Sequence, residues 1–516
     1  MDNKSIQNRI FKGTITIVFV GILAKFASFI AEAVMAAYLG TTSQSDAYYM
    51  IASVHAVVYP MMSVGIWKVF LPLYKRHIAT GDTKTANALT DKTLSFFFVV
   101  SIVVVFLLIA FSPAVVSVVA PGFREETRAL CIKLVRLSAP QYIFILASAV
   151  YASMLQCQNK FLGSQIREVV SHIPTIVAAV FFYRSFGIEA MAIALVVAGV
   201  LRLLIELPFV DWGYRYKPDF DFRGNEFALM LKRLPSALVS AGVAQINTLI
   251  DKAMASTLPT GTVSALNYGH KLTNVFSGLL SSAIATAMYP QMIEMISLNK
   301  KDELSRLVTK IISLFCVLMV PITVACGLFR TELVSAVFQR GAFDASSTIL
   351  TANVFALYCL SLFSVACNTV ISNIFYGYGN TRTPMYIGLA NLGINVALNL
   401  IFIRIWGVNG LALATSLSSF ITFFIRLGAS ERYISLDRKV LVTVSVKVLL
   451  ASAAACFTPR VIFWLHPANR YLTLVVSAAV GVGLYVGALK LLKVAEINDL
   501  VILLNQRMKS RQDSSE

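Results

Sequence analysis

The sequence predicts an all-α protein that crosses a membrane about fourteen times, and two observations carry this prediction. First, 57% of the 516 residues are hydrophobic and only 14% are charged, whereas soluble domains carry about 25% charged residues. Second, stretches such as Leu94–Ala110 and Tyr471–Leu489 contain no charged residue, which suits a bilayer core that needs about 20 apolar residues per helix. Because backbone groups in lipid must be satisfied internally, these segments are expected to be helices.

Turn residues and charges divide the chain into fourteen apolar segments. The segments are residues 11–39, 47–74, 93–120, 129–157, 161–183, 187–210, 227–258, 261–293, 304–329, 346–377, 383–404, 409–430, 440–459 and 471–492. The connections between them are rich in loop residues, as in Gly40–Ser45, Pro121–Glu126 and Pro259–Gly261. Each segment is therefore predicted to be one membrane helix, joined to the next by a short loop.

The net charge of +18 indicates how these helices are oriented. Twenty-three of the 44 basic residues fall in the loops and termini on one side of the predicted membrane, and eight fall on the other side. Since cytoplasmic loops carry the excess of Lys and Arg, both termini are predicted to be cytoplasmic. An even number of helices agrees with this orientation. No polar domain is available to bind nucleic acid, so we expect no nucleic-acid partner.

An internal repeat indicates how the helices are grouped. Residues 182–207 partly match residues 402–427 at a fixed offset of 220, with Arg184 falling on Arg404. Each repeat would hold six helices, and an even number gives both halves the same orientation, as in transporters built from parallel repeats. Two equivalent lobes of this kind can rock about a central site and open it to each side in turn.

The repeat predicts three parts of the chain. Residues 1–215 form an N-terminal lobe of helices 1–6, and residues 216–435 form a C-terminal lobe of helices 7–12. Residues 436–516 add two helices and a cytoplasmic tail.

The remaining thirteen basic residues lie inside or against apolar segments, where a charge costs roughly 2.5–3.5 kcal/mol at a helix centre. Such residues tend to face a bundle interior or a water-filled cavity. The segments that open the two repeats also carry acids and amides, and a cation cluster among them suits an anionic group such as a pyrophosphate. The predicted substrate-binding residues are Lys25, Glu32, Asp46, Asn247, Asn267 and Lys271. The candidates for binding a coupling ion are Asp46 and Asp251.

Several of these charges also have a structural interpretation. Lys68, Lys252 and Lys447 can extend their charged ends to the membrane interface. Asp251 and Lys252 are adjacent and can form a structural ion pair. The pairs Arg167–Glu168 and Arg202–Glu206 are more typical of contacts within a helix or within a lobe than of ligand sites.

Short motifs make the sequence resemble the MviN/MurJ family of lipid II flippases, within the multidrug/oligosaccharidyl-lipid/polysaccharide exporter superfamily. The resemblance covers residues 10–430. The motifs are SDAYYM (45–50), VVAPGFREETRALCIKLVRLSAP (118–140), INTLIDKAMAS (246–256), ALNYGHKL (265–272), AIATAMYPQM (283–292), VFQRGAFD (337–344) and GYGNTRTP (377–384).

The resemblance implies a two-lobe exporter with a central cationic cavity that moves an undecaprenyl-pyrophosphate-linked peptidoglycan precursor to the outer leaflet. Lys25 and Lys271 stand where this family has arginines, and Asp46 matches an acidic residue of the family. Ala31 and Tyr59 replace two further family arginines. Lysine attracts phosphate but lacks the two-pronged geometry of arginine, so these differences leave the choice of lipid-linked substrate open.

The sequence thus predicts a non-enzymatic flippase for lipid II in the bacterial cytoplasmic membrane, with cell-wall synthesis enzymes as partners. A flippase for another polyprenyl-linked oligosaccharide is the main alternative. A cation-coupled drug exporter, a membrane glycosyltransferase and a structural scaffold fit the buried lysines and the short loops less well. No cofactor is expected, because the sequence contains no GxxxxGK[ST] nucleotide-binding motif. The membrane potential or a monovalent ion is the expected energy source.

Overall fold

A computed structural model describes residues 3–210, 214–465 and 470–494, and every regular element in these ranges is a helix. The all-α prediction is therefore confirmed for the described residues. The elements are α1 (Asn3–Leu39), α2 (Ser43–Ala79), α3 (Thr83–Ala110), α4 (Ser112–Val119), α5 (Glu125–Ser138), α6 (Gln141–Cys157), α7 (Phe161–Val170), α8 (Ile173–Val177), η1 (Ala178–Phe182), α9 (Tyr183–Phe186), α10 (Glu189–Glu206), η2 (Leu207–Phe209), α11 (Asn225–Ala255), α12 (Thr262–Ser297), α13 (Lys301–Leu328), α14 (Arg330–Phe338), α15 (Ala345–Cys359), α16 (Leu362–Gly377), α17 (Arg382–Ser430), α18 (Arg438–Leu465) and α19 (Arg470–Leu491).

Ten helical segments within the described ranges are long and apolar enough to cross a membrane, or eleven if the bent pair α5–α6 is one span. That tally counts α17 once, although its 49 residues are more than twice the length of one span. Gly407 interrupts α17 with a non-helical backbone, in the gap between the predicted segments 383–404 and 409–430. Helices α11 and α12 are also longer than 30 residues. The fourteen predicted segments are consistent with this arrangement.

The predicted segment 161–183 is broken more often than expected. Pro174 lies in the first turn of α8, so the chain bends after α7. A π-helical turn, η1, follows α8 and leads into the short helix α9. Such turns widen a helix locally and recur at functional sites.

By packing, the described chain divides into two compact units. Unit 1 comprises the chain up to Ser264 together with the loop Arg340–Ser347, and unit 2 comprises Ala265–Gln339 and the chain from Thr348 onward. Helix α11 thus belongs to unit 1, where it packs along α2. The three parts expected from the repeat (1–215, 216–435 and 436–516) stay a prediction, and residues 495–516 of the expected tail lie outside the described ranges.

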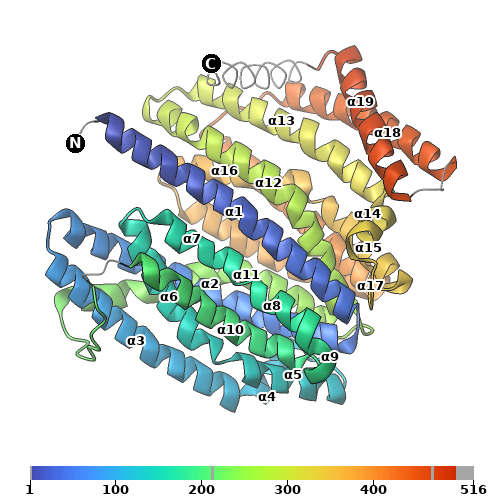
Figure 1. Ribbon diagram of the computed structural model, residues 1–516. Coiled ribbons are helices and arrows are strands. Elements are labelled where there is room, and N and C mark those ends of the chain that lie inside the picture. The colour runs from blue at the N-terminus through green and yellow to red at the C-terminus, as the bar shows by residue number, and fades with distance from the viewer. Residues whose placement is uncertain (1–2, 211–213, 466–469, 495–516) are drawn as a thin grey trace, which may run out of the picture. The chain divides into compact units, whose positions relative to one another are not determined.

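The core of unit 1 lies between α2, α3, α6 and α11. Phe70 and Tyr74 of α2 stack on each other, and they share an apolar cluster with Phe97 of α3 and Phe227 of α11. Along another side of the unit, α1 runs beside α7 and α8 (Figure 1). These contacts fix α2 between its neighbours, and α2 carries the candidate site residue Asp46.

Unit 2 is built around α13 and the helices that pack against it. Helix α13 packs against α16 and α18, and α18 pairs with α19 (Figure 1). Val317 of α13, Val448 of α18 and Leu489 of α19 are buried together in one cluster. Helix α16 packs along α17. Most of α12, with the predicted residues Asn267 and Lys271, belongs to this unit.

Candidate functional site

Asp46 lies in the first turn of α2 and is 3% exposed. Its Oδ1 accepts hydrogen bonds from the backbone N–H of Ser264, at 2.8 Å, and from the Ser264 hydroxyl. Its Oδ2 accepts the backbone N–H of Gly261 at 2.6 Å. The first N–H groups of a helix have no partner within the helix, and Asp46 satisfies those at the start of α12. This carboxylate, predicted to bind substrate or an ion, therefore holds the α11–α12 loop on α2.

The loop Arg340–Ser347 is held against the end of α1 inside unit 1. The backbone N–H of Ala342 donates to the carbonyl of Ala37 at 2.7 Å. Gly341 has φ of +58°, and a Cβ there would lie 2.2 Å from the Ala37 oxygen. Both the backbone conformation and the close approach require glycine. This packing explains the glycine of the VFQRGAFD motif.

Asp344 of the same loop caps helix α15. Its Oδ1 accepts the backbone N–H of Ser347 at 2.8 Å, and the Ser346 hydroxyl donates to the same oxygen at 2.9 Å. These hydrogen bonds favour the charged carboxylate, and they hold the pKa of Asp344 below its usual range. The exposed Asp344 thus has the same kind of capping role as the buried Asp46.

The two candidates on α1 lie in different surroundings. Lys25 is exposed, whereas Glu32 is 8% exposed and lies close enough to Tyr48 for their charges to interact. Because they are seven residues apart, Lys25 and Glu32 are expected on one face of α1. Their exposure differs because other residues cover α1 near Glu32, where Ala31 and Met35 are also buried.

Helix α11 contributes two candidates to unit 1. Asn247 has a buried side-chain oxygen that accepts no hydrogen bond from the residues described. Asp251 is 4% exposed and its neighbour Lys252 is 7% exposed. Lys252 donates to the carbonyl of Tyr49 at 3.5 Å and lies 5.9 Å from the centre of the Tyr49 ring. Lys252 therefore packs inside unit 1, and the expectation that it extends to the membrane interface is wrong.

Asn267 and Lys271 lie one turn apart on α12, so they share one face of that helix in unit 2. Asn267 is 8% exposed, and Lys271 is partly exposed. Beside them, the ring of His270 lies 5.6 Å from that of Tyr358.

The candidates divide between the units. Unit 1 holds Lys25, Glu32, Asp46, Asn247 and Asp251, whereas unit 2 holds Asn267 and Lys271. Their convergence on one cavity stays a prediction.

The positions that replace family arginines also have clear surroundings. Ala31 is 5% exposed and packs in the interior of unit 1. Tyr59 lies beneath the guanidinium of Arg202, which is 5.0 Å from the centre of the ring. A cation thus lies next to position 59 although the side chain there is neutral.

Sequence reasoning did not single out a polar network in the core of unit 1. The Nδ1 of His55 lies 2.7 Å from the Tyr142 hydroxyl, and its Nε2 lies 2.9 Å from the Ser138 hydroxyl. Ser138 in turn donates to the carbonyl of Leu134 at 2.8 Å. These partners satisfy a neutral imidazole and connect α2, α5 and α6. A lone histidine in an apolar segment gave no signal of this network.

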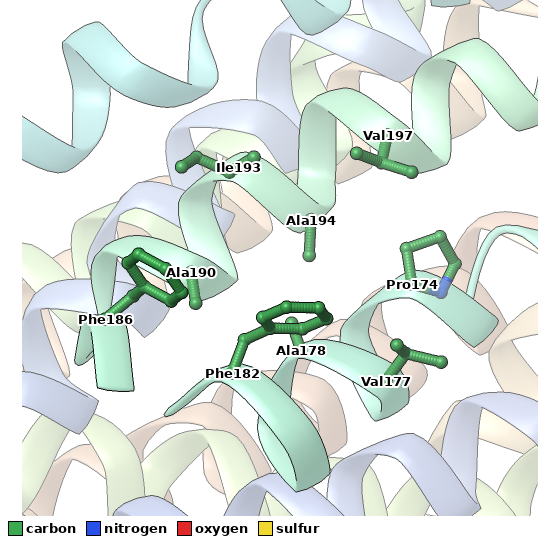
Figure 2. Close-up of a pocket in the computed structure, with 9 residues that line it drawn as sticks. All are labelled: Pro174, Val177, Ala178, Phe182, Phe186, Ala190, Ile193, Ala194 and Val197. Carbon is green, nitrogen blue, oxygen red and sulfur yellow. The ribbon is translucent and has the colours of Figure 1, made fainter. Parts of the chain in front are cut away.

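An apolar groove of about 350 Å³ lies between α8–η1–α9 and α10. Figure 2 shows the ring of Phe182 below the small side chain of Ala194, and the ring of Phe186 beside Ala190. Its lining residues are Pro174, Val177, Ala178, Phe182, Phe186, Ala190, Ile193, Ala194 and Val197. None of these side chains has a polar atom, so the groove suits hydrocarbon and cannot bind a charged headgroup.

The family model described as lipid II flippase MurJ matches residues 35–479, which is most of the chain. This protein belongs to the MurJ family. The match includes parts of both units and five of the seven candidate residues, whereas Lys25 and Glu32 of α1 precede it. Because members of this family are transporters, the prediction that the chain is not an enzyme is confirmed.

Curated relatives agree with this assignment over nearly their full lengths. A probable lipid II flippase MurJ from Rickettsia prowazekii is 23% identical over 508 residues, which cover 95% of this chain and 99% of the relative. A protein of the same name from Thermotoga maritima is 25% identical and covers 93% of this chain and 96% of the relative.

Solved structures support the fold. A lipid II flippase MurJ in an inward closed conformation matches with a TM-score of 0.81 at 20% identity, over 94% of this chain and 100% of that chain. An inward-facing multidrug transporter of the MATE family, in the MOP superfamily, matches with a TM-score of 0.69 at 13% identity, over 81% of this chain and 98% of that chain. The MurJ family thus shares its helical fold with exporters of other substrates.

Proposed function

We propose that this protein translocates lipid II, the polyprenyl-pyrophosphate-linked precursor of peptidoglycan, from the inner to the outer leaflet of the bacterial cytoplasmic membrane. The observation that carries the proposal is the family match over residues 35–479. The described helices, ten or eleven of which are long and apolar enough to span a bilayer, suit an integral membrane transporter.

The physical problem for such a transporter is to move a charged headgroup across a hydrocarbon layer about 30 Å thick. Side chains that replace the lost hydration of the pyrophosphate lower this barrier. We assign this role to Lys25 and Lys271, with Asn247 and Asn267 as hydrogen-bonding groups. The exposed side chain of Lys25 and the unsatisfied amide oxygen of Asn247 support the assignment. Glu32 can orient a nearby cation.

For Asp46 the observed hydrogen bonds favour the structural role over substrate or ion binding, which leaves Asp251 as the coupling-ion candidate. The membrane potential alone supplies about 2.3 kcal/mol per charge per 100 mV. With the inside negative, this drives an anionic headgroup outward. In this proposal both termini are cytoplasmic, and cell-wall synthesis enzymes on the outer side use the delivered substrate.

The test uses the full chain in liposomes that contain fluorescent lipid II, with and without an imposed potential. We expect lipid II to become accessible to an external probe only when the protein is present. A parallel set of liposomes carries a different polyprenyl-pyrophosphate-linked oligosaccharide. Faster movement of that lipid would assign the protein to the alternative substrate, and movement of neither lipid would overturn the proposal.

The site assignment is tested in a strain depleted of its own flippase. Lys25→Ala and Lys271→Ala should abolish growth at normal protein levels, because each removes a cation from the proposed headgroup contacts. Lys68→Ala is the matched control, since Lys68 is an exposed lysine within the α2 span. Normal growth with Lys25→Ala and Lys271→Ala would refute their assignment.

A further inference from the structure

Four charged side chains of unit 1 form a cluster between α7 and α10 within the membrane-spanning region. Arg167 and Glu168 come from α7, and Arg202 and Glu206 come from α10. The pairs cross between the helices: Arg202 lies 2.9 Å from Glu168, and Arg167 lies 3.3 Å from Glu206. We call these four residues the α7–α10 ion cluster. The expectation of contacts within a helix or within a lobe agrees with these pairs, although Arg202 pairs with Glu168 rather than with Glu206 of its own helix.

Within this cluster the two carboxylates are bound very differently. Glu168 is partly exposed and has a short contact to Arg202. Glu206 is 0% exposed, and neither of its oxygens accepts a hydrogen bond of normal geometry from the residues that the structure describes. Its contact to Arg167 Nη1 is long at 3.3 Å.

The Nη1 atom of Arg167 that contacts Glu206 also donates hydrogen bonds to other groups. Nη1 donates to the backbone carbonyl of Ser148 at 3.2 Å and to the Ser148 hydroxyl at 3.1 Å. Arg167 Nε lies 3.5 Å from Glu168. The guanidinium is therefore shared among α6, α7 and α10, and Glu206 receives only part of its charge.

The other titratable groups around the cluster add no second cation next to Glu206. Tyr59 of α2 lies beneath Arg202 and interacts with Glu168. His172, which follows α7, interacts with Glu168, and Tyr151 of α6 faces Glu206. With all four charged residues ionised, the α7–α10 ion cluster is neutral. Protonation of Glu206 would give it a charge of +1.

A buried carboxylate with few and poorly placed hydrogen-bond donors is costly, since buried polar groups in native proteins nearly always have partners. The neighbouring Ser148 hydroxyl favours the charged form of Glu206, but this hydroxyl also accepts from Arg167. Protonation removes the charge and supplies an O–H that can be donated. Ionisable groups inside membrane segments commonly mark proton or ion pathways. Glu206 is the last residue of α10, directly before η2, whose residues Leu207 and Pro208 are exposed.

We propose that Glu206 is a reversible proton-binding site of this transporter. In the deprotonation step the O–H bond of Glu206 breaks, the proton passes to water, and the electron pair stays on the carboxylate facing Arg167. Proton release then strengthens the ion pair between Glu206 of α10 and Arg167 of α7, and proton binding weakens it. The coupling of this step to lipid movement rests on the proposed function, but proton binding itself does not.

Infrared spectroscopy of the full protein, in a detergent without ester groups, detects the carbonyl band of a protonated carboxyl group. We expect a pH-dependent band in the wild-type protein that is lost in Glu206→Gln and kept in Glu168→Gln. A band that persists in Glu206→Gln, or no such band in the wild type, would overturn the proposal. Because glutamine matches the protonated acid in size and polarity, a Glu206→Gln protein that fails to fold would also overturn it.

Lipid movement is measured separately in liposomes with an imposed pH gradient or an imposed potential. We expect the pH gradient to change the rate of the wild-type protein and to have no effect on Glu206→Gln. If lipid II does not move under any condition, the proposed function fails while the infrared result still decides proton binding. An equal response of both proteins to the pH gradient would exclude coupling through Glu206.

Discussion

Two buried carboxylates of unit 1, Asp46 and Glu206, have similar burial but opposite hydrogen bonding. Asp46 accepts two backbone N–H groups and one hydroxyl, whereas Glu206 has one long contact to a shared arginine. A carboxylate that fills the open end of a helix has a structural reason to be charged and buried. A buried carboxylate that fills no helix end, such as Glu206, needs another explanation for its burial. Hydrogen-bond donors, rather than burial, therefore separate structural acids from candidate functional acids in this membrane protein.

The largest effect is expected at Asp46. Asp46→Ala leaves three donors at the start of α12 without their acceptor, and each unsatisfied buried donor costs about 1–3 kcal/mol. We expect the variant to lose about 3 kcal/mol or more of stability, measured as a lower melting temperature in detergent. Asp302→Ala is the control, because Asp302 is an exposed acid on α13. A stable Asp46→Ala protein that cannot move lipid would instead assign Asp46 to the transport site.

A smaller effect is expected when the cation next to Glu206 is removed. Arg167→Met should cost about 2 kcal/mol, which is less than the roughly 3–5 kcal/mol typical of a broken buried ion pair. The loss is reduced because Glu206 can bind a proton in place of its cation. Melting temperatures across a pH series test this, and the variant should approach the wild type as the pH falls. A deficit independent of pH would show that Glu206 stays charged.

The sequence predicted the helices well because each is encoded locally. The gap between the segments 383–404 and 409–430 matches the break at Gly407. The glycine of VFQRGAFD was recognised as part of a motif, but its reason, the close approach to Ala37, appeared only in the structure.

Tertiary partners could not be predicted in the same way. Asp46 and Ser264 are 218 residues apart, and neither has a local pattern that points to the other. Arg202 and Glu206 have the spacing of a pair on one helix, yet each binds a residue of α7 instead. Local spacing thus identified the charged groups but not their partners, because helix packing decided the pairing.

A partial loss of the Asp46 contacts should have an intermediate effect. Ser264→Ala removes the hydroxyl donor and leaves the backbone N–H groups of Ser264 and Gly261 in place. A hydrogen bond to a charged group is worth about 1.5–3 kcal/mol, so we expect a loss of about 1.5 kcal/mol by thermal denaturation. Ser346→Ala is the control, since its hydroxyl bonds to an exposed acid. Equal losses in the two variants would mean that burial does not strengthen the Asp46 contacts.

The smallest effect is expected at Asp344, the exposed counterpart of Asp46. Asp344→Ala removes the cap of α15, and the loss of a helix cap costs about 1 kcal/mol. Because the folded protein lowers the pKa of Asp344, this contribution is complete above the ordinary pKa of about 3.9 and is lost as the pH falls through the lowered value. The difference in melting temperature between Asp344→Ala and the wild type should therefore be constant near neutral pH and shrink in strong acid. A difference that grows in acid would mean that the protonated form of Asp344 is the one that the fold prefers, and the two capping acids would then not share one mechanism.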